Sequence, residues 1–297
     1  MRIGVIRNPQ AHGNRGKTAE TPPDLLYGEP TPAELRGELE RFQRGQVDLL
    51  VIDGGDGTVR DVLSVLPEGF RPLISVLPSG KTNILAFDLG IRASWTLAAV
   101  KAAAAREGHR IRHRTALTVH RGAEPALTGF FFGVAGLVHA MDLAHGLHRV
   151  KVVNNTSVGL TLLGSLAEFF FGGKDTVWRR GFPLRLGVDG AAPTEGRRLI
   201  TIATTLHRFP FAMRPFGPAR PGLKLLDVDA PPKSLGRALL KVLWGGGDSW
   251  LRRHGYRRGE ARALRFSLDS SFMMDGEIYP GGEIEVREGE RLRFLTP

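Results

Sequence analysis

The hydrophobic pattern divides the chain into two halves of different texture. In the first hundred residues, short apolar runs at 3–6, 47–52 and 73–77 alternate with segments whose apolar residues recur every three or four positions. Continuous apolar runs are typical of strands buried on both faces, so the alternation predicts a parallel sheet with helices on both sides. The expected helices are at about 31–45, 58–66, 83–89 and 94–106, and a weak further strand is expected at 25–27.

The first of these helices has a recognisable start. Thr31 suits the N-cap, Pro32 the first helical position and Glu34 the third, as in a capping box. The helix is expected to end near Gly45, because glycine is a frequent C-terminal stop.

After residue 108 the apolar runs become shorter and richer in β-branched and aromatic residues. Turn residues separate them, including Asp189-Gly190, a pair that predicts a hairpin turn. This half is expected to be an antiparallel β-sandwich or barrel, interrupted by helices at about 161–171 and 234–243. The expected strands are at 115–120, 129–136, 184–188, 199–205, 223–228, 263–268 and 283–286.

The predicted fold class is therefore an N-terminal α/β nucleotide-binding domain with a mostly parallel sheet, followed by a C-terminal antiparallel β-sandwich domain. The change of pattern places the domains at 1–110 and 111–297, with the last strand a candidate to return to the first domain.

Composition narrows the class of protein. The chain has 297 residues, of which 42% are hydrophobic, enough for two cores of ordinary size. It has no cysteine, which excludes a disulfide scaffold, thiolate catalysis and a cysteine-ligated metal. Neither the N-terminus nor the charge-poor stretch at 152–173 resembles a signal peptide or a spanning helix, so a soluble, cytoplasmic protein is expected.

The charge of the chain needs an explanation. Its formal net charge is +11, and only eight of the 41 basic residues are Lys. Because Arg binds phosphate through two parallel hydrogen bonds, the excess is compatible with a nucleic acid, an anionic membrane or a phosphorylated ligand.

The sequence Gly-Gly-Asp-Gly-Thr at 54–58 is the strongest chemical signal. It follows a buried strand and opens a helix, at the sheet edge where open α/β folds bind ligands. Glycines let backbone N–H groups approach a phosphate closely, and Asp56 can hold Mg²⁺ or direct a proton. The alternative is an ordinary tight turn in which Thr58 caps the helix.

Three further segments carry weaker signals of the same kind. Ser-Gly-Lys-Thr-Asn at 79–83 also joins a strand to a helix and offers a cation, a hydroxyl and an amide to a phosphate. A turn-rich loop follows the first strand at 8–16, and Asp-Gly-Glu at 275–277 brings two carboxylates together. Taken singly, each also fits an ordinary turn or loop.

In their order along the chain, Asn-Pro at 8–9 and the motifs at 54–58, 79–83 and 275–277 resemble the diacylglycerol kinase catalytic family. That family includes bacterial soluble lipid kinases and the sphingosine and ceramide kinases. The resemblance covers essentially the whole chain, and Leu-Leu-Asp-Val at 225–228 is similar to a late strand of the family. Because NAD kinases share Gly-Gly-Asp-Gly-Thr, that motif indicates the superfamily, while the others favour a lipid kinase.

The resemblance implies transfer of the γ-phosphoryl group of ATP to a lipid hydroxyl, with Mg²⁺ as cofactor and the site in the cleft between the domains. It implies that Asp275 is the catalytic base and that Asp56 acts at the metal and the nucleotide. The residues it assigns to nucleotide binding are Asn8, Gly54, Gly55, Asp56, Gly57, Thr58, Gly80, Lys81, Thr82, Asn83 and Glu277.

Two departures from the family pattern leave alternatives open. Ile84 stands where the family has an acid, and Arg-Pro-Gly at 220–222 replaces an Asp-Asp-Gly segment that holds a structural metal in some members. A catalytically impaired regulator of the same fold, or an NAD kinase-like enzyme, therefore remains as an alternative. A nucleic-acid binder is not expected, because no nucleic-acid recognition motif is present.

The Arg excess suggests a membrane partner. Basic pairs at 179–180, 197–198, 252–253 and 257–258 lie near Trp178, Trp250 and Tyr256, as in contacts with anionic lipid. The apolar segment 160–171 fits either core packing or membrane contact. The resulting expectation is a cytoplasmic protein that visits the inner face of the membrane and meets a lipid with a free hydroxyl there. A zinc site at His145 and His148 is a minor hypothesis, and the oligomeric state stays open, a homodimer included.

Overall fold

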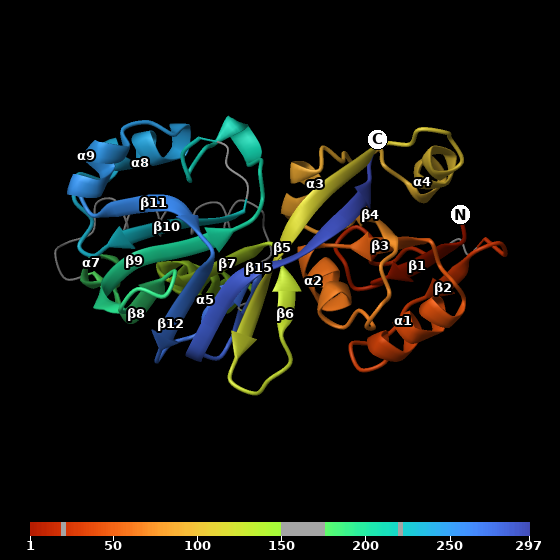
Figure 1. The fold of residues 1–297 in the computed structure, drawn as a ribbon, viewed down its shortest axis with the longest axis horizontal. Coiled ribbons are helices and arrows are strands. Elements are labelled where there is room, and N and C mark those ends of the chain that lie inside the picture. Colours follow the sequence, from red (N-terminus) through yellow and green to blue (C-terminus); the bar gives the residue numbers. More distant parts are fainter. Residues whose placement is uncertain (19–21, 150–175, 219–221) are drawn as a thin grey trace.

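In the computed structural model, which describes residues 1–18, 22–149, 176–218 and 222–297, strands from both halves of the chain join one continuous sheet. The sheet is parallel at one end and antiparallel at the other, which confirms the predicted fold class. Figure 1 shows two lobes side by side, with β5 (Ile111–Arg121) and β15 (Gly282–Leu295) running from one into the other.

The first lobe is built on four parallel strands in the order β2-β1-β3-β4. These are β1 (Ile3–Arg7), β2 (Leu26–Gly28), β3 (Leu49–Gly54) and β4 (Leu73–Pro78). Its helices are α1 (Leu35–Arg44), α2 (Asp56–Ser64), α3 (Ile84–Asp88) and α4 (Leu97–Ala104). The strand predicted at 47–52 is confirmed as β3, which lies between β1 and β4 and whose first four side chains are fully buried.

Two helices begin elsewhere than predicted. The N–H and hydroxyl of Thr31 do donate to the carboxylate of Glu34, at 3.0 and 2.8 Å. Residues 31–34 nevertheless close a separate turn, because the carbonyl of Thr31 accepts the N–H of Glu34, and α1 starts only at Leu35. In contrast, α2 starts at Asp56, two residues before the predicted Thr58, with Gly55 as its N-cap.

The second lobe contains the antiparallel part of the sheet. Its remaining strands are β6 (Leu127–Gly129), β7 (Phe131–Ala135), β8 (Phe182–Val188), β9 (Thr194–Thr204), β10 (Leu223–Asp229), β11 (Tyr256–Ala261), β12 (Ala263–Leu268), β13 (Phe272–Met274) and β14 (Glu277–Tyr279). Its helices are α5 (Gly136–Arg149), α7 (Val177–Arg180), the short 3₁₀ helix η1 (Pro210–Ala212), α8 (Leu235–Trp244) and α9 (Asp248–Arg253). The predicted turn at Asp189-Gly190 connects β8 to β9, with both residues at positive φ.

The last strand is longer than the predicted run at 283–286. β15 pairs with β5 along most of its length, and near its end Phe294 pairs in parallel with Ile74 of β4. Phe294 is fully buried in the core of the first lobe, whereas Val286 lies in a second core inside the second lobe. β15 therefore ties the two cores together.

Some predictions fall outside the described residues, namely the helix at 161–171 and the side chains of Trp178, His145 and His148. Among the helices that the structure describes, none combines the length and apolar character needed to cross a bilayer.

Candidate active site

The loops that follow β3 and β4 touch each other through two glycines. A Cβ atom added to Gly55 would lie 2.9 Å from the Cα of Gly80, and one added to Gly80 would lie 2.5 Å from the Cα of Gly55. Real Cβ contacts are essentially never that short. These two glycines, predicted to line a phosphate, are thus required for the close backbone approach of the loops.

Asp56, in the loop after β3, forms hydrogen bonds with the backbone that follows the loop after β4. Its carboxylate accepts the N–H groups of Ile84 and Leu85, at 3.0 and 3.1 Å, and so satisfies free donors in the first turn of α3. Burial raises the pKa of Asp56, while the hydrogen bonds from these amides oppose the rise. The side chain predicted to act at a metal is therefore also the joint between α2 and α3.

Asn83 shapes the loop between β4 and α3. Its side-chain oxygen accepts the N–H of Gly80 at 2.8 Å, and its amide group donates to the carbonyls of Gly80 and Pro78. Asn83 has a φ of +51°, a conformation that Asn tolerates better than most residues. Because Asn83 closes the loop from within, Lys81 and Thr82 are left exposed at its tip.

The loop after β1 packs against both of the others. The side-chain amide of Asn8 donates to the hydroxyl of Thr58 at 2.9 Å, and the N–H of Gly13 donates to the carbonyl of Ser79 at 2.7 Å. A side chain at Gly54 would meet Thr58, since an added Cβ would lie 2.5 Å from its Cβ and hydroxyl. Asn8, Gly54 and Thr58 therefore support the loops from behind.

Asp275 reaches this region from the other lobe. It lies in the turn between β13 and β14 with a φ of +44°. Its carboxylate accepts the N–H groups of Phe130 and Phe131, both at 3.0 Å. Burial raises the pKa of Asp275 to about 7; the amide of Phe130 counters the rise, and the nearby charge of Asp56 adds to it.

Arg60 is an important residue that the sequence analysis missed. Although charged, it is only 2% exposed, and its guanidinium donates to the carbonyl of Met274 at 3.1 Å and to the carboxylates of Asp61 and Glu277. It also lies over the ring of Tyr279, 5.5 Å from the ring centre. The sequence offered only a weak signal, an Arg that follows the apolar Val59 and precedes Val62 and Leu63 on the same helix.

The two lobes enclose a cleft of about 220 Å³ at this point. It is lined by Gly55, Asp56, Gly57, Arg60, Lys81, Thr82, Asp275, Gly276 and Glu277. The structure thus brings together seven residues that the sequence analysis selected from three separate segments. The other five, Asn8, Gly54, Thr58, Gly80 and Asn83, do not line this cleft.

A second cavity of about 530 Å³ lies beside the first loop and Ser79. Lys17, Asp53 and Trp95 are among its lining residues. Asp53 accepts the hydroxyl of Ser79 at 2.5 Å and the amide of Asn14 at 3.1 Å, so its carboxylate organises this wall.

The cleft suits a divalent cation that arrives with a phosphorylated ligand. Within the described residues, no three acidic, His or Cys side chains gather in a way that could hold a metal by themselves. Mg²⁺, however, commonly uses one or two carboxylates together with phosphates and water. Asp56 and Asp275 lie close enough for the charge of one to raise the pKa of the other, and a cation at the cleft would relieve this repulsion.

Comparison with known families agrees with this geometry. Residues 2–115 match the diacylglycerol kinase catalytic domain. The resemblance seen in the sequence is thereby confirmed for this part of the chain. No curated protein matches the chain by sequence.

Solved structures show the same fold over the full chain. A diacylglycerol kinase from Bacillus anthracis is 16% identical, with a TM-score of 0.61 over 100% of this chain and 97% of its own. A second structure from that organism, provisionally assigned as a diacylglycerol kinase, reaches a TM-score of 0.64 at 17% identity with the same coverage. An NAD kinase from Archaeoglobus fulgidus, in complex with ATP, is 16% identical, with a TM-score of 0.51 over 100% of this chain and 94% of its own.

The departure at position 84 does not disrupt the loops. Ile84 contacts Asp56 through its backbone N–H, which any residue other than proline supplies. Of the segment 220–222, only Gly222 lies within the described residues.

The basic pairs predicted to meet a membrane divide into two kinds. Arg198 and Arg257 form ion pairs with Asp227 and Asp229, and Arg258 pairs with Asp248, so these three stabilise the second lobe. Tyr256, predicted to lie at a membrane interface, is instead buried, with its hydroxyl donating to the carbonyl of Lys233 at 3.0 Å.

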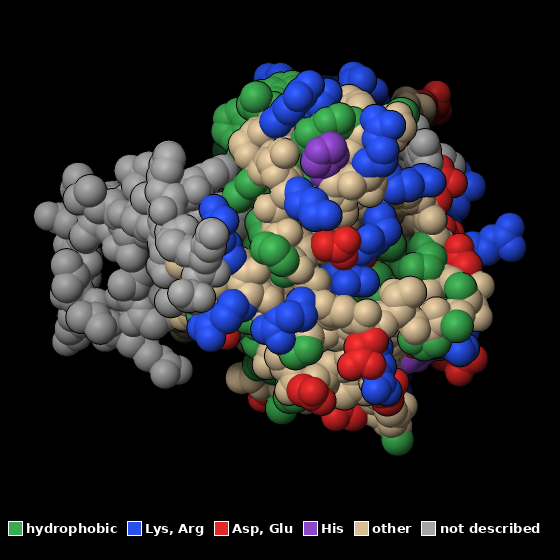
Figure 2. Space-filling model, turned by 90° about the vertical axis from the view of Figure 1, so that its left-hand side faces the viewer, with side chains coloured by type: hydrophobic (Ala, Val, Ile, Leu, Met, Phe, Trp, Pro, Cys, Tyr) green, Lys and Arg blue, Asp and Glu red, His purple; other side chains and the backbone are tan. Residues whose placement is uncertain are grey.

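The other kind is exposed at the surface. Arg252 and Arg253, in the last turn of α9, have no ion pair within the described part of the chain, and Trp250 stacks on His254 beside them. Figure 2 shows basic side chains spread over this end of the second lobe among fewer acidic ones.

Proposed function

We propose that the protein is an ATP-dependent lipid kinase that transfers the γ-phosphoryl group of ATP to a hydroxyl of diacylglycerol or a related lipid. One observation carries the proposal: Asp275 of the second lobe and the glycine loop of the first line the same cleft. The match of residues 2–115 to a kinase catalytic domain supports phosphotransfer, and the lipid acceptor is our extension of it.

The nucleotide is expected to lie across the three loops. Its phosphates would meet the backbone of residues 55–57, where the N-terminus of α2 offers N–H groups, together with the ammonium group of Lys81. A cleft of about 220 Å³ is too small for a whole nucleotide, so the adenosine part is assigned to the cavity lined by Lys17, Asp53 and Trp95.

Asp56 is the residue that would hold Mg²⁺ in this arrangement. When bound, the ion would neutralise charge on the phosphates during transfer. Proton transfer and the positioning of the base are assigned to side chains of the protein.

Asp275 is assigned as the base. Its carboxylate would take the proton of the lipid hydroxyl as that oxygen forms a bond to the γ-phosphorus and the bond from phosphorus to ADP breaks. A pKa of about 7 suits a base that works near neutral pH. Arg60 acts as a positioning residue, because it holds the carbonyl of Met274, the residue before the base.

The acceptor is expected to come from an anionic membrane surface. Leu240 and Trp244 on α8 are 59% and 61% exposed, and the free Arg252 and Arg253 lie on the next helix. Apolar side chains beside basic ones suit a peripheral contact in which the protein docks on a bilayer without crossing it.

An assay with labelled ATP, Mg²⁺ and three acceptors tests the proposal: diacylglycerol in mixed micelles, a total lipid extract, and NAD. We expect a labelled lipid, and we expect Asp275→Asn to abolish it while ATP binding is retained. ATP binding without any labelled product would favour the impaired regulator, and labelled NADP would favour the NAD kinase-like enzyme. Either result would overturn the lipid-kinase proposal.

A further inference from the structure

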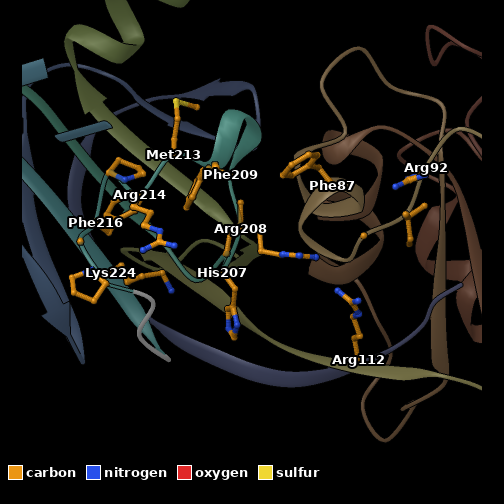
Figure 3. A pocket seen from close by; sticks show the side chains of 17 residues that line it. Phe87, Arg92, Arg112, His207, Arg208, Phe209, Met213, Arg214, Phe216 and Lys224 are labelled. Atoms are coloured by element: carbon orange, nitrogen blue, oxygen red, sulfur yellow. The ribbon is translucent and has the colours of Figure 1, made fainter. Parts of the chain in front are cut away.

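A separate cavity of about 780 Å³ lies between the two lobes, at the C-terminal end of α3, whereas Asp56 binds the N-terminal end of that helix. Its walls come from the end of α3 and the start of β5 on one side, and from residues 206–218 and β10 on the other. Figure 3 shows Phe87 and Arg112 on the first side and Arg208, Phe209 and Arg214 on the second. It shares no lining residue with the cleft that contains Asp275.

The cavity is lined by basic side chains without acidic ones. The basic residues are Arg92, Arg112, His207, Arg208, Arg214 and Lys224, and no Asp or Glu is among the described residues that line it. Within the described chain, the four arginines form no ion pair. Burial lowers the pKa of Arg112, and repulsion by Arg110, Arg208 and Arg114 lowers it further.

A buried carboxylate close to the cavity is already paired. Asp88, at the end of α3, is fully buried and forms an ion pair with Arg114. It also accepts the backbone N–H groups of His207 and Arg208, at 3.1 and 2.8 Å. Asp88 therefore fixes the segment that carries Arg208. Its charge also raises the pKa of Arg112, but it forms its ion pair with Arg114 and does not line the cavity.

We propose that this cavity is a binding site for a phosphate-bearing ligand. Like charges brought together without a counter-charge are unfavourable unless an anion joins them. A phosphate group offers several acceptor oxygens and up to two charges, which suits guanidinium groups that approach from both lobes. Phe87, Phe209 and Phe216 line the same cavity and give the ligand an apolar surface to rest on.

Such a ligand would link the two lobes. Arg92 and Arg112 lie on the side of α3, and Arg208 and Arg214 lie on the opposite wall, so one anion can bridge them. Because Asp56 holds the start of α3, the bridge would also reach the loops of the candidate active site. The binding itself does not depend on the proposed kinase activity.

Isothermal titration with pyrophosphate, at low salt and with the nucleotide site filled by a non-hydrolysable ATP analogue, tests the proposal. A second arm measures sedimentation with vesicles of phosphatidylglycerol and of phosphatidylcholine. We expect binding in at least one arm, and we expect Arg112→Gln/Arg208→Gln to weaken it about 10-fold to 100-fold. Arg44→Gln, an exposed Arg on α1, is the matched control and should bind like the wild type.

The arms also separate the two sources of phosphate. Pyrophosphate binding that the double variant loses indicates a soluble phosphorylated compound. If the double variant loses binding to phosphatidylglycerol vesicles and the wild type does not bind pyrophosphate, the ligand is a lipid headgroup. Because neither arginine forms an ion pair with a residue that the structure describes, the double variant should unfold at the temperature of the wild type, which checks its folding. Absence of binding in both arms, or equal binding by the double variant, would overturn the proposal.

Discussion

The carboxylate of Asp56 accepts the backbone N–H of Ile84 across a distance of 3.0 Å, although 28 residues separate them in the sequence. This bond joins the start of α2 to the start of α3, and both helices begin at the loops that line the cleft. The same side chain therefore determines the shape of the site and contributes charge to it.

We expect Asp56→Ala to lower both stability and activity. The substitution leaves two backbone donors of α3 without their acceptor, so the free energy of unfolding should fall by about 1.5–3 kcal/mol. Urea denaturation measures this change, and the kinase assay should show no activity. Glu68→Ala, at an exposed position outside the cleft, is the control and should change neither quantity. An Asp56→Ala variant as stable as the wild type would show that the cap is unimportant.

The contact between Gly55 and Gly80 can be tested with a pair of alanine substitutions. In Gly80→Ala the new Cβ must push the loop at 54–58 away, so we expect a loss of about 1–3 kcal/mol and weaker ATP binding. Gly37→Ala is the matched control, because Gly37 lies inside α1 with open space around it. That change should stabilise the protein by about 0.5–1 kcal/mol. Unchanged ATP binding by Gly80→Ala would contradict the role of the close approach.

The pKa of Asp275 predicts how catalysis depends on pH. A base with a pKa of about 7 must lose its proton to act, so kcat/KM should rise through neutral pH and level off above it. Glu285, a half-buried acid of β15 that lies outside the cleft, gives the control: Glu285→Gln should leave the profile unchanged. A profile that is flat from about pH 5.5 to 8.5 would argue against Asp275 as the base.

The raised pKa of Asp275 also predicts that the free energy of unfolding depends on pH. Because burial raises the pKa of Asp275 from 3.8 to about 7, the folded protein keeps a proton that the unfolded chain releases in this range. The stability that the protonated Asp275 contributes is therefore fully present below the unfolded-state pKa of 3.8. It is lost as the pH rises through the folded-state pKa of about 7. Asp275→Asn should remove this part of the slope in urea denaturation series. An unchanged slope would show that Asp275 does not titrate in that window.

Arg60→Gln tests the positioning role. The carbonyl of Met274 loses its buried donor, so we expect a loss of about 1–3 kcal/mol in the free energy of unfolding. Since the charge of Arg60 lowers the pKa of Asp275, its removal should also move the rising limb of kcat/KM to higher pH. Arg60→Lys restores the charge and should return the limb toward its original position. A purely structural role would lower the stability without moving that limb.

Membrane contact is expected to depend on α9. Each basic residue near an anionic surface contributes about 1 kcal/mol, so Arg252→Gln/Arg253→Gln should weaken binding to phosphatidylglycerol vesicles about 10-fold to 30-fold. Added salt should weaken wild-type binding too, because exposed charges are screened. Arg36→Gln, on the first lobe, serves as the control. Equal binding to neutral and anionic vesicles would contradict the proposal.

The sequence by itself determined most of the first lobe. Buried parallel strands show as continuous apolar runs, and the run at 47–52 predicted β3 (Leu49–Gly54) because a strand buried on both faces needs no polar side chain in alternate positions. The glycine loops were recognisable for a similar reason, since their chemistry is local. The start of α1 was not, because Thr31 and Glu34 form the same hydrogen bonds in a turn as in a capping box.

Only the tertiary structure decided what each site residue does. Asp56 and Ile84, or Arg60 and Met274, meet through the packing of distant segments, and no local pattern encodes such contacts. The roles of the many arginines were likewise not predictable from the sequence. A count of charges cannot tell Arg257, neutralised by Asp227, from Arg112, which faces a cavity and forms no ion pair with any described residue. That distinction depends on which side chains the fold brings within a few ångströms of each other, because electrostatic interactions fall with distance and with exposure to water.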